Sequence, residues 1–285
     1  MRFAVIGGDE RSALLCALLC ADGHKVRSFA LERARLPEEV PKETCLQSCV
    51  YAADCVVLPV PAERAGLLNS PLSDEKIPMS ELIPALWAGQ IVCGGKLSEE
   101  SRAEGARLRL HLCDIMASHS FCAGNAALTA EGALELMMSA SPQSIWKSRV
   151  LVTGWGRIGM MLCFHLRALG AKVTLAARSA KDRAAARAFG FSALDYPRLE
   201  GEIGSFDFIV NTVPARVISD AMLCCVQADT PLIELASPPG GFDRNLAENI
   251  GLKTIHAPGL PGTSAPWSAA ILMRETIYEF LEDIE

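Results

Sequence analysis

The sequence predicts an α/β fold of two related lobes, each with a parallel sheet, linked by crossing helices. The first observation behind this prediction is an internal repeat: residues 2–31 align without a gap with residues 149–178, so that Gly7 matches Gly154 and Gly23 matches Gly170. The second is that each repeat reads as an apolar strand, a glycine turn, an amphipathic helix and another strand, which is the opening of a βαβ unit. Both lobes are therefore expected to be Rossmann-like.

Further short apolar runs follow each repeat and alternate with helical stretches, as in parallel sheets covered on both faces. Strands are expected over 55–59, 90–93 and 108–113 in the first lobe, and over 206–210, 231–235 and 253–256 in the second. A long helix is expected over 125–140, and the tail over 268–284 is amphipathic. The predicted domains are an N-terminal one over 1–120 completed by a C-terminal helix over 266–285, an inter-lobe helix over 121–145, and a second Rossmann-like domain over 146–265.

Composition and charge exclude several classes of protein. The chain has 285 residues, half of them apolar, and a formal net charge of −6. This composition is globular, and its acidic balance argues against binding to nucleic acid or to an anionic membrane, because both need a basic surface. The apolar stretch near the N-terminus, residues 13–21, is too short to span a bilayer and follows charged residues. We expect a cytoplasmic protein without a membrane span or signal peptide.

The eleven cysteines lie mostly in apolar or helical patterns, including Cys224 and Cys225, and form no CxxC pair. The five histidines are scattered along the chain. We therefore expect buried, reduced thiols and no metal site.

The second repeat contains a complete GxGxxG motif between its strand and its helix, Gly154-Trp155-Gly156-Arg157-Ile158-Gly159. The first glycine permits a tight turn, the second admits a pyrophosphate, and the third allows the helix to pack closely on the strand. The free N–H groups at the start of the helix favour an anion. The motif thus predicts dinucleotide binding in the second lobe.

In the first repeat the same position holds Gly7-Gly8-Asp9. The carboxylate of Asp9 would repel a diphosphate, so this lobe is not expected to bind a dinucleotide. Its turn either faces a substrate cleft or caps a helix, for which Asp is well suited.

The end of the second strand of the second lobe favours NADP over NAD. NAD sites usually place an acid there to hold the ribose 2′-hydroxyl, whereas this chain has Ala177-Arg178-Ser179, with Lys181 nearby. A guanidinium and a hydroxyl suit a 2′-phosphate; alternatively, Arg178 stacks on the adenine. Two loops at the same edge of the sheet are expected to border the nicotinamide, namely Asn211-Thr212-Val213-Pro214 and the loop that opens with Leu235-Ala236.

These motifs resemble, in order along nearly the whole chain, those of the family of dipicolinate synthase A subunits. The matching stretches are residues 4–9, 58–60, Asn125 with Thr129 and Glu131-Gly132, 154–159, 177–179, Asn211-Thr212, 235–237 with Gly240-Gly241, and 257–262. The family pattern has Arg where this chain has Pro238, so a guanidinium that could bind a carboxylate is missing there. The wider fold is similar to that of the hydroxyacid and alanine dehydrogenases.

The resemblance implies an NADP-linked oxidoreductase subunit that forms dipicolinate from dihydrodipicolinate, or from its hydroxy-tetrahydrodipicolinate precursor, during sporulation. It implies the mother-cell cytosol of a spore former and a second, flavoprotein-like subunit; a homo-oligomer stays open. The alternatives are a nucleotide-binding regulatory subunit of that complex and an alanine or shikimate dehydrogenase-like oxidoreductase.

A small dicarboxylate substrate needs hydrogen-bond donors for two carboxylates. The candidates are Asn125, Thr129, Lys96, His119 and a helix N-terminus near Thr129. Glu131 and His119 are the candidate catalytic bases. His256 lies on an expected strand, where a histidine is usually a satisfied core residue, so we do not expect it to act as the acid–base of a hydroxyacid dehydrogenase.

Overall fold

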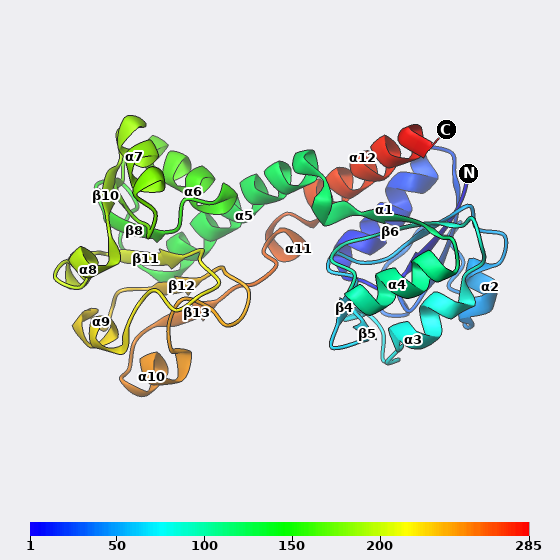
Figure 1. The fold of residues 1–285 in the computed structure, drawn as a ribbon, viewed down its shortest axis with the longest axis horizontal. Coiled ribbons are helices and arrows are strands. Elements are labelled where there is room, and N and C mark those ends of the chain that lie inside the picture. The colour runs from blue at the N-terminus through cyan, green and yellow to red at the C-terminus, as the bar shows by residue number, and fades with distance from the viewer. Residues whose placement is uncertain (285) are drawn as a thin grey trace. The chain divides into compact units, whose positions relative to one another are not determined.

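The computed structural model describes residues 1–284, and the chain divides into two compact units. Unit 1 comprises Met1–Asn125 and the segment that begins at Ala265, and unit 2 comprises Ala126–Ser264. Figure 1 shows that each unit contains strands flanked by helices. Each unit is described by itself below.

The internal repeat is confirmed by the boundaries of its elements. Unit 1 opens with β1 (Arg2–Ile6), α1 (Glu10–Ala21) and β2 (Lys25–Phe29), and unit 2 contains β8 (Arg149–Thr153), α6 (Arg157–Ala168) and β9 (Lys172–Ala176). Every boundary in the second set is the first-set number plus 147, as in 149 − 2 = 147. The two segments therefore form the same helix and strands over the same aligned residues.

The sheet of unit 1 has the strand order β2-β1-β3-β6-β7, and all of its strands are parallel. The remaining strands are β3 (Cys55–Val57), β6 (Ile91–Gly94) and β7 (His111–Asp114). One face packs against α1 and α12 (Pro266–Ile284) through residues such as Leu15 and Ile277. The smaller helices and a β-hairpin complete the unit: α2 (Leu46–Val50), α3 (Met79–Leu82), α4 (Glu99–Arg107), β4 (Glu63–Arg64) and β5 (Leu67–Leu68).

The sheet of unit 2 has the parallel order β10-β9-β8-β11-β12-β13, which is the 3-2-1-4-5-6 order of a dinucleotide-binding fold. Its other strands are β10 (Ser192–Leu194), β11 (Phe208–Asn211), β12 (Leu232–Glu234) and β13 (Thr254–His256). Two buried clusters, one containing Leu162 and the other Leu223, cover the sheet. The remaining helices are α7 (Ala180–Ala188), α8 (Tyr196–Leu199), α9 (Asp220–Cys225), α10 (Arg244–Asn249) and α11 (Pro261–Ser264).

One long helix, α5 (His119–Ala140), starts earlier than the sequence analysis expected. Ser118 Oγ accepts a hydrogen bond from the Phe121 N–H at 3.1 Å, which places the helix start beside Ser118. Thr129 therefore lies inside the helix, where backbone N–H groups bond to carbonyls one turn earlier. The expected helix N-terminus near Thr129 is wrong, and residues 141–145 lie beyond the helix.

All eleven cysteines are free. Cys224 and Cys225 are exposed, contrary to expectation, because α9 buries Met222 and Leu223 instead. In the part of the chain that the structure describes, no helix is long and apolar enough to cross a membrane.

Candidate functional site

The glycine-rich turn of unit 2 joins β8 to α6, and each of its glycines has a distinct role. Gly154 has a φ of +89°, a left-handed conformation that favours glycine. A Cβ on Gly159 would lie 2.1 Å from the carbonyl oxygen of Gly154, so only glycine allows this close packing. A Cβ on Gly156 would meet no atom of the described chain within 4 Å. The turn is therefore closed on its inner side and open beside Gly156.

The N-terminus of α6 is suited to an anion. Gly156 occupies the N-cap position with extended backbone, and in residues 1–284 no side chain caps this helix end. The first N–H groups of a helix have no partner within the helix and carry its positive dipole end. Trp155 packs against Phe191, with ring centroids 5.8 Å apart, and so anchors the turn to the domain. The residues present fit a diphosphate at this point.

The matching turn of unit 1 is closed by its own side chains. Asp9 caps α1 by accepting from the Arg11 N–H at 3.1 Å. The buried Arg11 guanidinium donates to both oxygens of Asp9, at 2.9 and 2.7 Å, and to the Val60 carbonyl oxygen at 2.6 Å. The structure thus confirms the prediction that Asp9 caps this helix.

The loop after β11 lies directly against the glycine-rich turn. A Cβ on Gly154 would lie 2.7 Å from Val213 Cγ2 and 2.8 Å from Thr212 Oγ1, so both side chains pack closely against this glycine. The Thr212 hydroxyl donates to the Thr153 carbonyl oxygen at 2.6 Å. Asn211 is fully buried, and its side chain bonds to protein groups, including the Glu234 carboxylate.

Sequence reasoning missed Glu234, which is the last residue of β12 and only 5% exposed. Its carboxylate also accepts from the backbone N–H groups of Ala236 and Gly241 and so holds the loop that opens with the buried Leu235 and Ala236. The sequence did contain a signal, namely an acid at the end of an otherwise apolar strand. A carboxylate that is buried there needs several hydrogen-bond donors around it.

The end of β9 presents a basic corner. Ala177 is buried, whereas Arg178 and Lys181 are exposed. The Ser179 hydroxyl caps α7 by accepting from the Asp182 N–H at 3.3 Å. The Arg183 guanidinium, which the sequence analysis did not single out, donates to the carbonyl oxygens of Ala177 and Arg178 at 2.8 and 2.6 Å. It thereby fixes the backbone that carries the Arg178 side chain.

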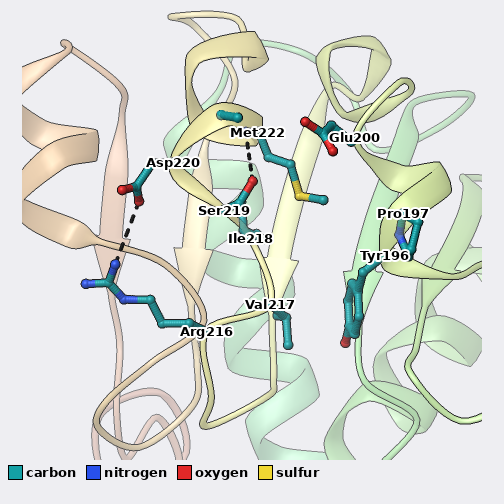
Figure 2. A pocket seen from close by; sticks show the side chains of 10 residues that line it. Tyr196, Pro197, Glu200, Arg216, Val217, Ile218, Ser219, Asp220 and Met222 are labelled. Carbon is teal, nitrogen blue, oxygen red and sulfur yellow. Dashed lines mark hydrogen bonds and ion pairs between the residues drawn. The ribbon is translucent and has the colours of Figure 1, made fainter.

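An open pocket of about 670 Å³ lies between α8 and the segment that leads into α9 (Figure 2). Figure 2 shows the Tyr196 ring on one side of this pocket and Val217 on the other. Arg216, at its edge, pairs with Asp243 at 2.8 Å and with Asp220 at 3.7 Å. Burial raises the pKa of Tyr196 to about 12, while the positive charge of Arg178 acts in the opposite direction. The Arg178 guanidinium is therefore close enough to Tyr196 for its charge to act on the phenol.

The expected substrate residues belong to both units. Lys96, His119 and Asn125 lie in unit 1, and Thr129 and Glu131 in unit 2. Lys96 is exposed and has a left-handed φ of +58°; its N–H donates to Asp114 Oδ1 at 3.0 Å. His119 and Glu131 are exposed and Thr129 is buried.

His256 is not a core residue, contrary to expectation. It is exposed at the end of β13, because β13 is the edge strand of its sheet. Together with Pro238 and Arg244, it lines a small pocket of about 80 Å³.

Comparison with known proteins identifies relatives over the whole chain. The family model for the N-terminal domain of the dipicolinate synthase A subunit matches residues 2–116. The A subunit of dipicolinate synthase from Bacillus subtilis (strain 168) is 27% identical, covering 100% of this chain and 97% of the relative. The crystal structure of that Bacillus subtilis protein matches with a TM-score of 0.83 at 26% identity, covering 100% of this chain and 96% of that one. The corresponding structure from Bacillus halodurans matches with a TM-score of 0.84 at 26% identity, covering 98% and 97%.

A more distant likeness concerns the fold alone. An L-alanine dehydrogenase structure has a TM-score of 0.63 at 12% identity and covers 99% of this chain and 89% of its own. The predicted architecture of two Rossmann-like lobes is confirmed. Residues 2–116 match the family model for the N-terminal domain of dipicolinate synthase A subunits, and the chain is similar to that subunit over its full length.

Proposed function

We propose that this chain is the nucleotide-binding subunit of a dipicolinate synthase and that unit 2 binds NADP at its glycine-rich turn. The observation that carries the proposal is the open space beside Gly156 at the start of α6. The related turn of unit 1 has Asp9 in that place, so the two lobes differ where a diphosphate would bind. The similarity to the A subunit of dipicolinate synthase supports the same assignment.

The preference for NADP over NAD rests on the basic corner at the end of β9. The exposed Arg178 would bind the 2′-phosphate, and Lys181 would add positive charge. Arg183 would hold the backbone of this corner in place through its hydrogen bonds to two carbonyl oxygens. Ser179 can still donate its hydroxyl proton while its oxygen caps α7. The neighbouring pocket with Tyr196 and Val217 is of suitable size for the adenosine half.

The proposed reaction is the oxidation of dihydrodipicolinate to dipicolinate. A bound nicotinamide supplies the hydride acceptor: one hydride leaves a ring carbon, one ring proton goes to a base, and the product is aromatic. Lys96, Asn125 and Thr129 are the proposed donors to the substrate carboxylates, and Glu131 or His119 the proposed base. Among the proposed donors, Lys96 carries a full positive charge and is exposed, so its ammonium group is available to a carboxylate.

The proposal includes a partner. The related protein is named as one subunit of its synthase, so we propose a complex with a second, flavoprotein-like subunit, formed in the mother-cell cytosol of a spore-forming bacterium. The hydroxy-tetrahydrodipicolinate precursor is the alternative substrate.

The test is a reconstitution of the purified chain with its partner subunit. With freshly generated precursor and NADP, we expect a product with pyridine absorbance and the stoichiometric appearance of NADPH. Product formed at the same rate without nucleotide would overturn the redox role. A chain that binds NADP and stimulates its partner without NADPH appearing would be a regulatory subunit instead.

A further inference from the structure

We infer that Glu234 is a positioning residue for the dinucleotide site, acting through Asn211 on the backbone that supports the glycine-rich turn. This inference rests on the proposed function of unit 2. The Glu234 carboxylate hydrogen-bonds to Asn211, Ala236 and Gly241 rather than to the turn, so its effect must be transmitted through other groups.

The first step is the carboxylate itself. Glu234 Oε1 accepts from Asn211 Nδ2 at 2.6 Å and from the Ala236 N–H at 2.9 Å, and Oε2 accepts from the Gly241 N–H at 2.7 Å. All three partners are N–H donors, so the site needs two accepting oxygens. A side-chain amide would turn an NH₂ group toward one of these donors.

The second step is the orientation of Asn211. Its Nδ2 faces Glu234 and also donates to the Val213 carbonyl oxygen at 2.9 Å. Its Oδ1 accepts from the Thr153 hydroxyl and from the Val213 N–H at 3.2 Å. A carboxylate can only accept hydrogen bonds, so Glu234 selects the Nδ2 end of the Asn211 amide. The Oδ1 end therefore points to Thr153. Gly241 packs on the same amide, since a Cβ there would lie 2.3 Å from Asn211 Cγ.

The third step reaches the glycine-rich turn. Asn211 holds both the N–H and the carbonyl of Val213, and the Val213 side chain lies against Gly154. Thr153, which bonds to the Asn211 side chain, is the residue immediately before Gly154. The network thus ties the ends of three adjacent strands, β8, β11 and β12, to the turn expected to hold the diphosphate.

The test compares nucleotide affinity among variants of the full chain by calorimetric titration with NADPH. Glu234→Gln is expected to weaken binding about tenfold or more while the protein stays folded at the assay temperature. It is also expected to speed amide hydrogen exchange over residues 211–213 and 235–241. Glu248→Gln is the matched control, because this exposed carboxylate pairs with Arg244 on α10 and belongs to a different set of contacts.

A second variant covers the case in which Glu234→Gln does not fold. Thr153→Val removes the hydroxyl that bonds to Asn211 with little change in shape, and a weakening of about threefold is expected. Wild-type affinity in a folded Glu234→Gln protein, or in Thr153→Val, would overturn the inference and leave the proposed function intact. A wild-type chain that binds neither NADPH nor NADH would overturn the proposed function and this inference with it.

Discussion

Asp9 and Gly156 occupy equivalent positions in the two copies of the repeat, since 9 + 147 = 156, and they have opposite effects on the helix that follows. The Asp9 carboxylate fills the N-terminus of α1 and is itself held by Arg11. Gly156 leaves the N-terminus of α6 open. Two turns with the same boundaries therefore differ in whether an external anion fits.

Removing the charge of Asp9 should destabilise unit 1 without affecting nucleotide binding. Arg11 is only 8% exposed, and Asp9→Asn would leave its guanidinium without a charged partner. Because the Asp9 side chain is 30% exposed, we expect a loss of about 1–3 kcal/mol in the free energy of unfolding, below the cost of breaking a fully buried pair. Urea denaturation measures this loss, and NADPH titration should give an unchanged affinity.

Glu104→Gln is the control for Asp9→Asn, because the Glu104–Arg107 pair lies on the surface of α4. It should leave the unfolding midpoint unchanged. Equal midpoints for Asp9→Asn and the wild type would contradict a stabilising role of the Asp9–Arg11 pair.

The two glycines of the α6 turn should respond differently to a methyl group. In Gly156→Ala the new Cβ points into open space, so the melting temperature should hold while NADPH affinity falls about tenfold or more. In Gly159→Ala the Cβ would clash with the Gly154 carbonyl oxygen, which should cost about 1–3 kcal/mol of stability. Thermal unfolding together with titration separates the two effects. Unchanged NADPH affinity in Gly156→Ala would mean that no diphosphate binds there.

The repeat, the parallel α/β lobes and the glycine turn could be predicted because each depends on local sequence pattern. The Asn211–Glu234 pair could not, because its residues are 23 positions apart and meet only once β11 and β12 lie side by side. The start of α5 was placed at Asn125 because this polar residue resembled a helix start. The hydroxyl of Ser118, which lies earlier in the chain, in fact caps the helix. Local pattern thus located the candidate cofactor site and Asn211, but not the buried Glu234 that holds the Asn211 side chain.

The buried thiol of Cys163 should make unit 2 sensitive to alkaline pH. Burial raises the pKa of Cys163 to about 12, whereas an unfolded thiol has a pKa of about 8.5. Between roughly pH 9 and 12 the unfolded chain loses this proton and the folded chain keeps it, so stability falls as pH rises, by up to about 1.4 kcal/mol per pH unit. Urea denaturation from pH 8 to 10.5 should show a shallower decline in Cys163→Ala.

Cys224→Ala is the control for that decline, because Cys224 is exposed on the same unit. It should keep the wild-type dependence on pH. A slope in Cys163→Ala that equals the wild-type slope would contradict a protonated, buried Cys163 thiol.

Reversing the charge of Arg178 should invert the choice of cofactor. Arg178→Asp places a carboxylate at the end of β9. This carboxylate would repel the 2′-phosphate of NADPH and could accept a hydrogen bond from the ribose 2′-hydroxyl of NADH. Because a charge-assisted hydrogen bond contributes about 1.5–3 kcal/mol, NADPH affinity should fall about tenfold or more while NADH affinity holds or rises. Lys172→Asp, the same charge reversal at the exposed start of β9, should change neither affinity. Trp155 lies within the glycine-rich turn, so its fluorescence can follow both titrations. Tighter binding of NADH than NADPH by the wild type, or an unchanged ratio of the two affinities in Arg178→Asp, would mean that Arg178 does not bind the 2′-phosphate.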